Sequence, residues 1–274
     1  MNPHWIIPDW PAPPGVKAVF TTRHGGVSPA PFDSMNLGDH VGDAPTLVAA
    51  NRALLSQLLG AKAVFLQQAH GAQVASLHLH TPDRSVADAC TTAAHNVACT
   101  IMVADCLPVL LATRCGALVG SAHAGWRGLA GVPAAGAGEA ALSHPQHGVL
   151  EALFESFMPA GQASTAFKAT DLIAWLGPCI GPGAFQVGGE VKAAFAATQS
   201  GASAHFVANG PGKFLANLPA LARGRLQAMG LADAQIYGND SSARWCTASN
   251  PSDFFSYRRD GVRTGRMAAC IWKT

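Results

Sequence analysis

Apolar residues along this chain recur with two different periods, which predict both helices and strands. The segment 44–60, "APTLVAANRALLSQLLG", carries apolar residues at helical spacing, with Pro45 in its first turn and Gly60 at its end, so we expect a helix. Shorter apolar runs predict strands at 17–23, 63–71, 72–80, 99–113, 116–128, 171–182, 235–240 and 266–273. We expect 63–71 and 72–80 to pair as a hairpin. We expect 99–113 to be one buried strand, bulged near Asp105 to Pro108.

The remaining segments complete a mixed pattern. Helices are predicted at 188–197 and 214–230, with helical pieces such as 149–158 inside the Ala- and Gly-rich stretch 129–168. Two long loops are expected, at 24–43 and 246–261, and loops of that length are often functional. Strands and helices mix without strict alternation. The pattern therefore predicts an α/β (mixed α+β) fold, a single layered domain over 1–274 with mixed β-sheets flanked by helices.

Composition narrows the function classes. The net charge of +2 in 274 residues gives no strong field to attract nucleic acid or a membrane surface. The first residues lack the features of a signal peptide, and no uninterrupted apolar stretch is long enough for a membrane helix, so we expect a cytoplasmic protein. Seven cysteines, an odd number without a CxxC pair, favour buried thiols over a disulfide framework. The oligomeric state, monomer or homodimer, stays open.

Three residues that can bind a metal stand where predicted strands end or bulge: His70, Cys106 and His123. Two imidazoles and a thiolate suit Zn²⁺, and three protein ligands leave the fourth tetrahedral position open for water or substrate. Each residue taken singly is also compatible with a core histidine or an inert buried thiol. Asp105, beside the cysteine, could orient a histidine ligand or cap a turn.

Arginines at loops suggest an anion site. Arg23 precedes the first long loop, Arg127 follows His123 by four residues, and Arg258 and Arg259 follow "FFSY". The planar guanidinium binds phosphate through two parallel hydrogen bonds. The alternative is that the C-terminal arginines 258, 259, 263 and 266 form a solvated face. The "HLH" at 78–80 has the form of a copper ligand pair, but one such pair is weak evidence for an oxidase with several coppers.

Six ordered motifs together resemble the laccase-domain family, also called the multicopper polyphenol oxidase-like or purine nucleoside phosphorylase family. They extend from residue 21 to the C-terminal region and include "TTRHGGVSPAPFDSMNLGDHVGD", "QQAHGAQV", "ADCLPVLL", "SAHAGWRG", "LGPCIGP" and "CTASNPSDFFSYRRDGVRTGRMAACIW". The resemblance implies a layered α/β domain with zinc in a surface cavity. In the family, the ligands occupy the positions of His70, Cys106 and His123, the trio that the strand ends indicate.

The resemblance also implies an activity. Adenosine, inosine or methylthioadenosine would react with phosphate to give the free base and a ribose 1-phosphate, with adenosine deamination as a second activity. Two alternatives stay open: copper-dependent phenol oxidation by a laccase, and hydrolytic editing of a peptidoglycan precursor. The expected partners are small molecules only, a nucleoside and phosphate, and the expected metal is Zn²⁺ with copper as the alternative.

Roles for the other candidate residues follow as hypotheses. Arg127 and Arg258 would hold phosphate, and Asp105 would act as acid or base at the purine. Asn36, Asp39 and Tyr257 would bind ribose hydroxyls or the base, and Arg23 is a further candidate for substrate binding.

Overall fold

The computed structural model describes residues 2–132, 147–158 and 167–274. Within them, β-strands form three sheets. The first sheet has the order β1 (Val16–Phe20), β13 (Met267–Lys273), β5 (Val97–Val103), β2 (Lys62–Phe65). The second has the order β12 (Ile236–Gly238), β8 (Leu172–Leu176), β6 (Leu107–Thr113), β7 (Val119–Ala124), β4 (Ala89–Thr92), β3 (Val74–Ser76). A small third sheet consists of β10 (Phe206–Ala208), β11 (Lys213–Ala216) and β9 (Gln186–Gly188).

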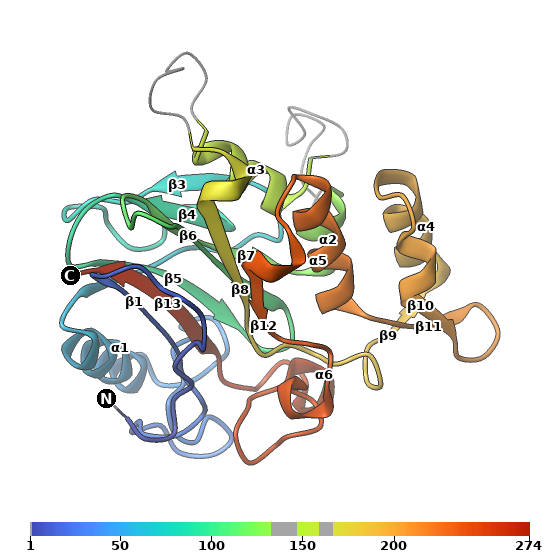
Figure 1. Cartoon of the computed structure of the whole chain (residues 1–274). Helices are drawn as coiled ribbons and strands as arrows, with labels where there is room; N and C mark the ends of the chain where they lie inside the picture. Colours follow the sequence, from blue (N-terminus) through green and yellow to red (C-terminus); the bar gives the residue numbers. More distant parts are fainter. Residues whose placement is uncertain (1, 133–146, 159–166) are drawn as a thin grey trace.

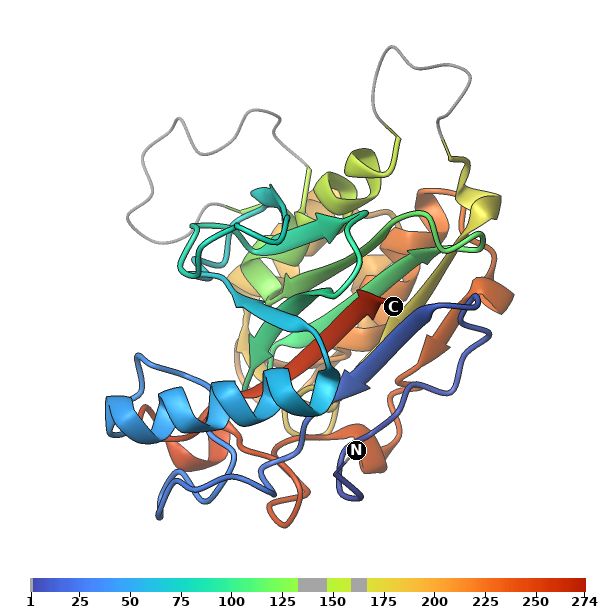
Figure 2. The same ribbon diagram turned by 90° about the vertical axis from the view of Figure 1, so that its left-hand side faces the viewer.

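The two large sheets pack face to face (Figures 1 and 2). Along β13, Met267 and Ile271 point into the apolar layer between the sheets, whereas Ala268 and Trp272 point to the other face. Successive side chains of a strand lie on opposite faces, so both faces of β13 are buried. This is why the core strands read as nearly continuous apolar runs in the sequence. Both large sheets mix parallel and antiparallel pairs.

Helices cover the two outer faces. Helix α1 (Pro45–Leu59) packs on the four-stranded sheet. The outer face of the six-stranded sheet is covered by α2 (Trp126–Ala130), α3 (Val149–Ser156), α4 (Gly189–Thr198) and α5 (Leu218–Ala228). The described residues also form α6 (Tyr257–Asp260) and the short 3₁₀ turns Ala169–Asp171, Ala202–His205, Asp233–Gln235 and Ala243–Trp245. The predicted mixed class, layered sheets flanked by helices, is confirmed.

Several local predictions are also confirmed. Helix α1 begins with Pro45 and ends at Gly60, whose positive φ of 64° closes the last turn. The stretch 24–43 holds no helix or ladder strand, as expected for a long loop. The helical piece predicted at 149–158 is α3, but most of the remaining stretch 129–168 lies outside the described residues. In the part of the chain that the structure describes, no helix is long and apolar enough to cross a membrane.

Two strand predictions and one helix boundary were wrong. The segments 63–71 and 72–80 do not form a hairpin, because β2 belongs to the four-stranded sheet and β3 pairs with β4 in the other. The segment 99–113 is not one bulged strand; β5 and β6 lie in different sheets and are joined by a tight turn at residues 104–106. The predicted helix at 214–230 begins only at Leu218, because residues up to Ala216 pair in the small sheet. The chain crosses between the sheets beside the predicted metal ligands.

Candidate metal centre

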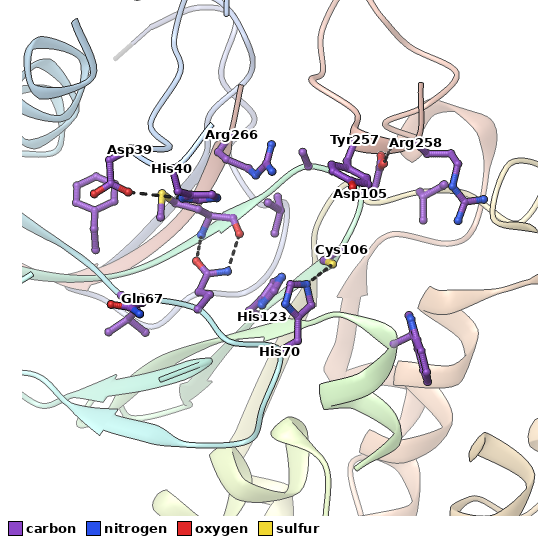
Figure 3. Close-up of a pocket in the computed structure, with 18 of the residues that line it drawn as sticks. Asp39, His40, Gln67, His70, Asp105, Cys106, His123, Tyr257, Arg258 and Arg266 are labelled. Carbon is purple, nitrogen blue, oxygen red and sulfur yellow. Dashed lines mark hydrogen bonds and ion pairs between the residues drawn. The ribbon is translucent and has the colours of Figure 1, made fainter. Parts of the chain in front are cut away.

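The fold brings His70, Cys106 and His123 together. β6 and β7 are antiparallel neighbours in which Pro108 pairs with His123, so Cys106 and His123 lie at the same end of the sheet. His70 reaches this end from the loop after β2. Its ring centroid lies 4.7 Å from that of His123, and its Nε2 lies 3.9 Å from the sulfur of Cys106. One ligand atom from each residue falls within 4.8 Å of the others (Figure 3).

Asp88 positions two of the three ligands. Its buried carboxylate accepts hydrogen bonds from the backbone N–H groups of Ala69, His70 and Gly71, at 2.7–3.0 Å. The same carboxylate lies 2.8 Å from Nδ1 of His123, so a proton on Nδ1 leaves Nε2 free to bind a metal. Three successive amides around one carboxylate form a backbone nest, which fixes His70 in the left-handed conformation with φ 59°.

The charges in this cluster favour a thiolate. Burial raises the pKa of the Cys106 thiol, but His123 and His70 outweigh that effect and lower the pKa to about 6. Burial lowers the pKa of His123, whereas Cys106 and Asp88 raise it more strongly, so the net direction is upward. A cysteine that ionises readily beside two imidazoles is a good ligand for a soft or borderline divalent cation.

The residues fit a metal ion of the size of Zn²⁺. Bonds of about 2.0–2.3 Å in a tetrahedral site put the ligand atoms roughly 3.3–3.8 Å apart, close to the observed sulfur–nitrogen separation. Gly125 leaves the space free. A Cβ atom at this position would lie 3.0 Å from the sulfur of Cys106 and 3.0 Å from Cδ2 of His70. Three protein ligands favour an open, catalytic type of site over a closed structural one.

The space at Gly125 gives a prediction. Gly125→Ala is expected to weaken zinc binding at least tenfold, because the methyl group pushes the thiolate and the His70 ring apart. Gly183→Ala is the matched control, since a Cβ there meets nothing within 4 Å. A competition titration with a chromophoric chelator measures both affinities. Equal zinc affinity of Gly125→Ala and the unchanged protein would show that zinc binding does not need the close approach of Cys106 and His70 to Gly125.

The three ligands lie on the wall of a cavity of about 650 Å³. Pockets for small molecules fall in the range of about 300–1,000 Å³. In Figure 3, Asp39, His40 and Arg266 lie on one side of the ligands, whereas Tyr257 and Arg258 lie on the other. We call these the arginine end and the aromatic end.

The arginine end is built from loop 24–43, α1 and the start of β13. Asp39 forms ion pairs with Arg52, at 3.4 Å, and with Arg84, at 3.0 Å. Burial raises the pKa of Asp39, but these two guanidinium groups outweigh it and lower the pKa overall. Asp39 is predicted to bind a ribose hydroxyl. A hydroxyl would have to compete with Arg52 and Arg84 for this carboxylate. His40 and Arg266 complete this end.

The aromatic end is organised by Asp105. Its carboxylate accepts hydrogen bonds from the hydroxyl of Thr247, at 2.5 Å, and from the backbone N–H of Arg258, at 2.6 Å. Arg258 lies 5.6 Å from the ring centre of Phe185, and its Nη1 donates to the carbonyl of Gln186. Asp105 therefore caps the start of α6, the second of its two predicted roles. Asp88 fills the first, the orientation of a histidine ligand.

Three predicted site residues lie away from the cavity lining. Arg23 donates to Asp33 and to the Pro251 carbonyl, and so joins two loops on the surface. Asn36 has no exposed surface, and its amide serves the loop that it belongs to. Arg127 stacks on the ring of Trp126, 4.3 Å from its centre. The substrate role of Arg23 and Asn36 and the phosphate role of Arg127 stay predictions, and the contacts of these side chains do not support them.

Other residues of the site carry no local signal in the sequence. Asp88 precedes a short strand and follows no apolar run, so no spacing rule singled it out. Arg52 falls on the polar face of α1, and Arg84 falls in a loop with no recognised motif. Arg266 was counted with the solvated C-terminal arginines, although its place at the start of a buried strand could have indicated an inward position.

Comparison with known proteins places this geometry in a family. Residues 17–274 match the sequence profile of the family described as multi-copper polyphenol oxidoreductase laccase. The chain belongs to this family. The resemblance drawn from the six motifs is thereby confirmed.

Relatives in the laccase-domain family carry a more specific name. A purine nucleoside phosphorylase of Pseudomonas aeruginosa is 45% identical over 270 residues, 98% of each chain. The purine nucleoside phosphorylase YfiH of Escherichia coli is 44% identical over 97% of this chain and 98% of its own length. A crystal structure from Neisseria meningitidis superimposes with a TM-score of 0.83 at 41% identity, covering 98% of this chain and 99% of the other.

Proposed function

We propose that this protein is a zinc-dependent purine nucleoside phosphorylase that cleaves adenosine, inosine and methylthioadenosine with phosphate. The observation that carries the proposal is the His70–Cys106–His123 cluster on the wall of a cavity with two chemically different ends. Relatives with 41–45% identity named purine nucleoside phosphorylase support it. Deamination of adenosine is proposed as a second activity of the same site.

The two ends of the cavity suit the two halves of the reaction. In phosphorolysis, phosphate bonds to C1′ of the ribose while the bond from C1′ to the purine nitrogen breaks, through a state with oxocarbenium character. The attacking anion and the departing base must lie on opposite sides of C1′. The cationic arginine end suits phosphate, and the aromatic end, with Tyr257 and Phe185, suits the purine.

Residues at the aromatic end would act on the base. Asp105 lines the cavity next to Cys106, and the hydroxyl of Thr247 and the backbone N–H of Arg258 hold its carboxylate in place. We therefore assign it to accept a hydrogen bond from the base. Tyr257 is half-exposed beside it and can close over the purine. Zinc held by the three ligands would supply Lewis-acid stabilisation of developing negative charge.

Phosphate dependence tests the proposal. The zinc-loaded protein is incubated with adenosine, with and without phosphate, and adenine, inosine and hypoxanthine are separated by chromatography. Adenine release that requires phosphate and matches ribose 1-phosphate mole for mole is the expected result. Adenine release at the same rate without phosphate would overturn the phosphorylase assignment, and inosine formation would report deamination.

One observation favours a second candidate, a hydrolase with a thiol nucleophile. Asp88, His123 and Cys106 are arranged like a Cys–His–Asp triad, with Asp88 2.8 Å from Nδ1 of His123. Such a site would suit hydrolytic editing of a peptidoglycan precursor. The two functions separate on one treatment, because zinc would inhibit a thiol hydrolase and activate the phosphorylase. Copper content with oxygen uptake would instead identify the laccase alternative.

A further inference from the structure

Arg266 differs from the other cations of the arginine end in having no acidic partner. Arg52 and Arg84 share the carboxylate of Asp39. The guanidinium of Arg266 donates through Nη1 to the carbonyls of Thr264 and Gly265, and it forms no ion pair with any described residue. Its Nε and Nη2 donate no hydrogen bond within the described part of the chain. Two donor groups of a fixed cation are thus available to a ligand.

The backbone and stem of Arg266 are held in place. Its N–H donates to the buried side chain of Asn36 at 2.9 Å, and its carbonyl accepts from Leu37. Gly38 packs so closely on the stem that a Cβ there would lie 2.7 Å from Cγ of Arg266. A cation whose stem is already ordered loses little conformational entropy when it binds an anion. Asn36, predicted to contact substrate, instead positions the residue that would.

Arg266 lies on the side of the arginine end that faces the aromatic end. Figure 3 shows it between His40 and Tyr257, above the metal ligands in that view. Its charge acts on Cys106 and Asp105 at the centre of the cavity, and burial lowers its pKa, although an arginine stays protonated. Burial and the Arg266 charge lower the pKa of His40, which favours a neutral ring that can donate to or accept from a ligand.

A partly buried guanidinium that faces a cavity with two unused donor groups, and with no ion-pair contact among the described residues, is stabilised by a bound anion. We propose that Arg266 is the main phosphate-binding residue of this cavity, in place of Arg127 and Arg258. The inference rests on the proposed function for its choice of ligand, inorganic phosphate. The same chemistry could serve the phosphate group of a nucleotide, so the test compares the two sources.

The test uses Arg266→Met and Arg266→Lys in the full zinc-loaded chain. Arg263→Met is the matched control, since Arg263 is exposed, lies three residues away and does not line the cavity. Calorimetry measures the binding of inorganic phosphate, and a parallel titration uses adenosine 5′-monophosphate. Assays at saturating adenosine give the KM for phosphate. Melting temperature and zinc content show whether each variant is folded and loaded.

We expect Arg266→Met to weaken phosphate binding and raise its KM at least thirtyfold, with the KM for adenosine changed less than twofold. Arg266→Lys, which keeps the charge but not the fork, should lose about three- to tenfold. Arg263→Met should stay within twofold of the unchanged protein. If Arg266→Met does not fold, Arg266→Lys alone decides the question.

Unchanged phosphate binding in folded Arg266 variants would overturn the inference, as would a loss confined to the nucleotide, or no phosphate binding by the unchanged protein. These results differ from failure of the proposed function. If phosphate binds through Arg266 while adenine is released without phosphate, the subsite stands and the phosphorylase assignment falls.

Discussion

Replacing His123 by alanine is expected to remove bound zinc and phosphate-dependent cleavage together. His123 is buried in β7 and is one of the three candidate ligands that the described residues bring together, so its loss leaves two. A two-ligand site holds zinc too weakly to survive dialysis, and we expect less than 0.1 zinc per chain and an activity loss of at least about 10³-fold, the scale of a lost catalytic group. Metal analysis and the chromatographic assay measure the two effects.

A control is needed because His123 also bonds to Asp88. His95 is an exposed histidine outside the cavity, and His95→Ala should keep both zinc and activity. The circular dichroism and melting temperature of both variants separate loss of metal from loss of fold. A folded His123→Ala protein that retains one zinc per chain would refute the ligand assignment.

The second large effect is expected at Asp88. Asp88→Ala removes the acceptor for three backbone N–H groups and for His123, all at the metal end of the sheet. Each buried donor left without a partner costs about 1–3 kcal/mol, so the loop that carries His70 should lose its fixed shape. Loss of a residue that orients metal ligands typically weakens metal affinity about 10–100-fold. We therefore expect weaker zinc binding and a lower melting temperature together.

Asp88→Asn refines this prediction. The asparagine keeps one oxygen, which can still accept from His123 or from the loop, but its NH₂ group faces another donor. We expect Asp88→Asn to lie between Asp88→Ala and the unchanged protein in zinc affinity. Asp240→Asn, at an exposed aspartate, is the matched control. Zinc affinity of Asp88→Ala within twofold of the unchanged protein would show that this carboxylate does not position the ligands.

The three candidate metal ligands could be picked out from the sequence because each stands at the end of an apolar run. His70 lies in the loop after β2, Cys106 in the turn between β5 and β6, and His123 near the end of β7, so each stands near a strand end, although the strands belong to two sheets. The two wrong strand predictions did not affect the choice of these three residues, because both errors concerned which sheet a strand joins. Whether 99–113 is one strand or two, Cys106 stays at a point where the chain turns.

The rest of the site was not predictable from local patterns. Asp88 contacts residues 17 to 35 positions away in the sequence, and the periodicity of apolar residues does not indicate contacts at such separations. The sheet change at Asp105 depends on a positive φ of 91° in a residue that usually avoids it, so the sequence favoured a continuous strand. The sequence does not show which arginines face the cavity. Arg127 stacks on a tryptophan, whereas Arg266 lines the cavity, and only tertiary packing decides between these surroundings.

Zinc titration of the metal-free protein tests most directly whether zinc at His70, Cys106 and His123 is required for phosphorolysis. The protein is stripped with a chelator, zinc is added in steps, and phosphate-dependent adenine release is measured at each step. We expect no activity without metal, a linear rise that ends at one zinc per chain, and no activity restored by copper. Full activity in the metal-free protein, or activity restored by copper alone, would contradict a zinc-dependent phosphorylase.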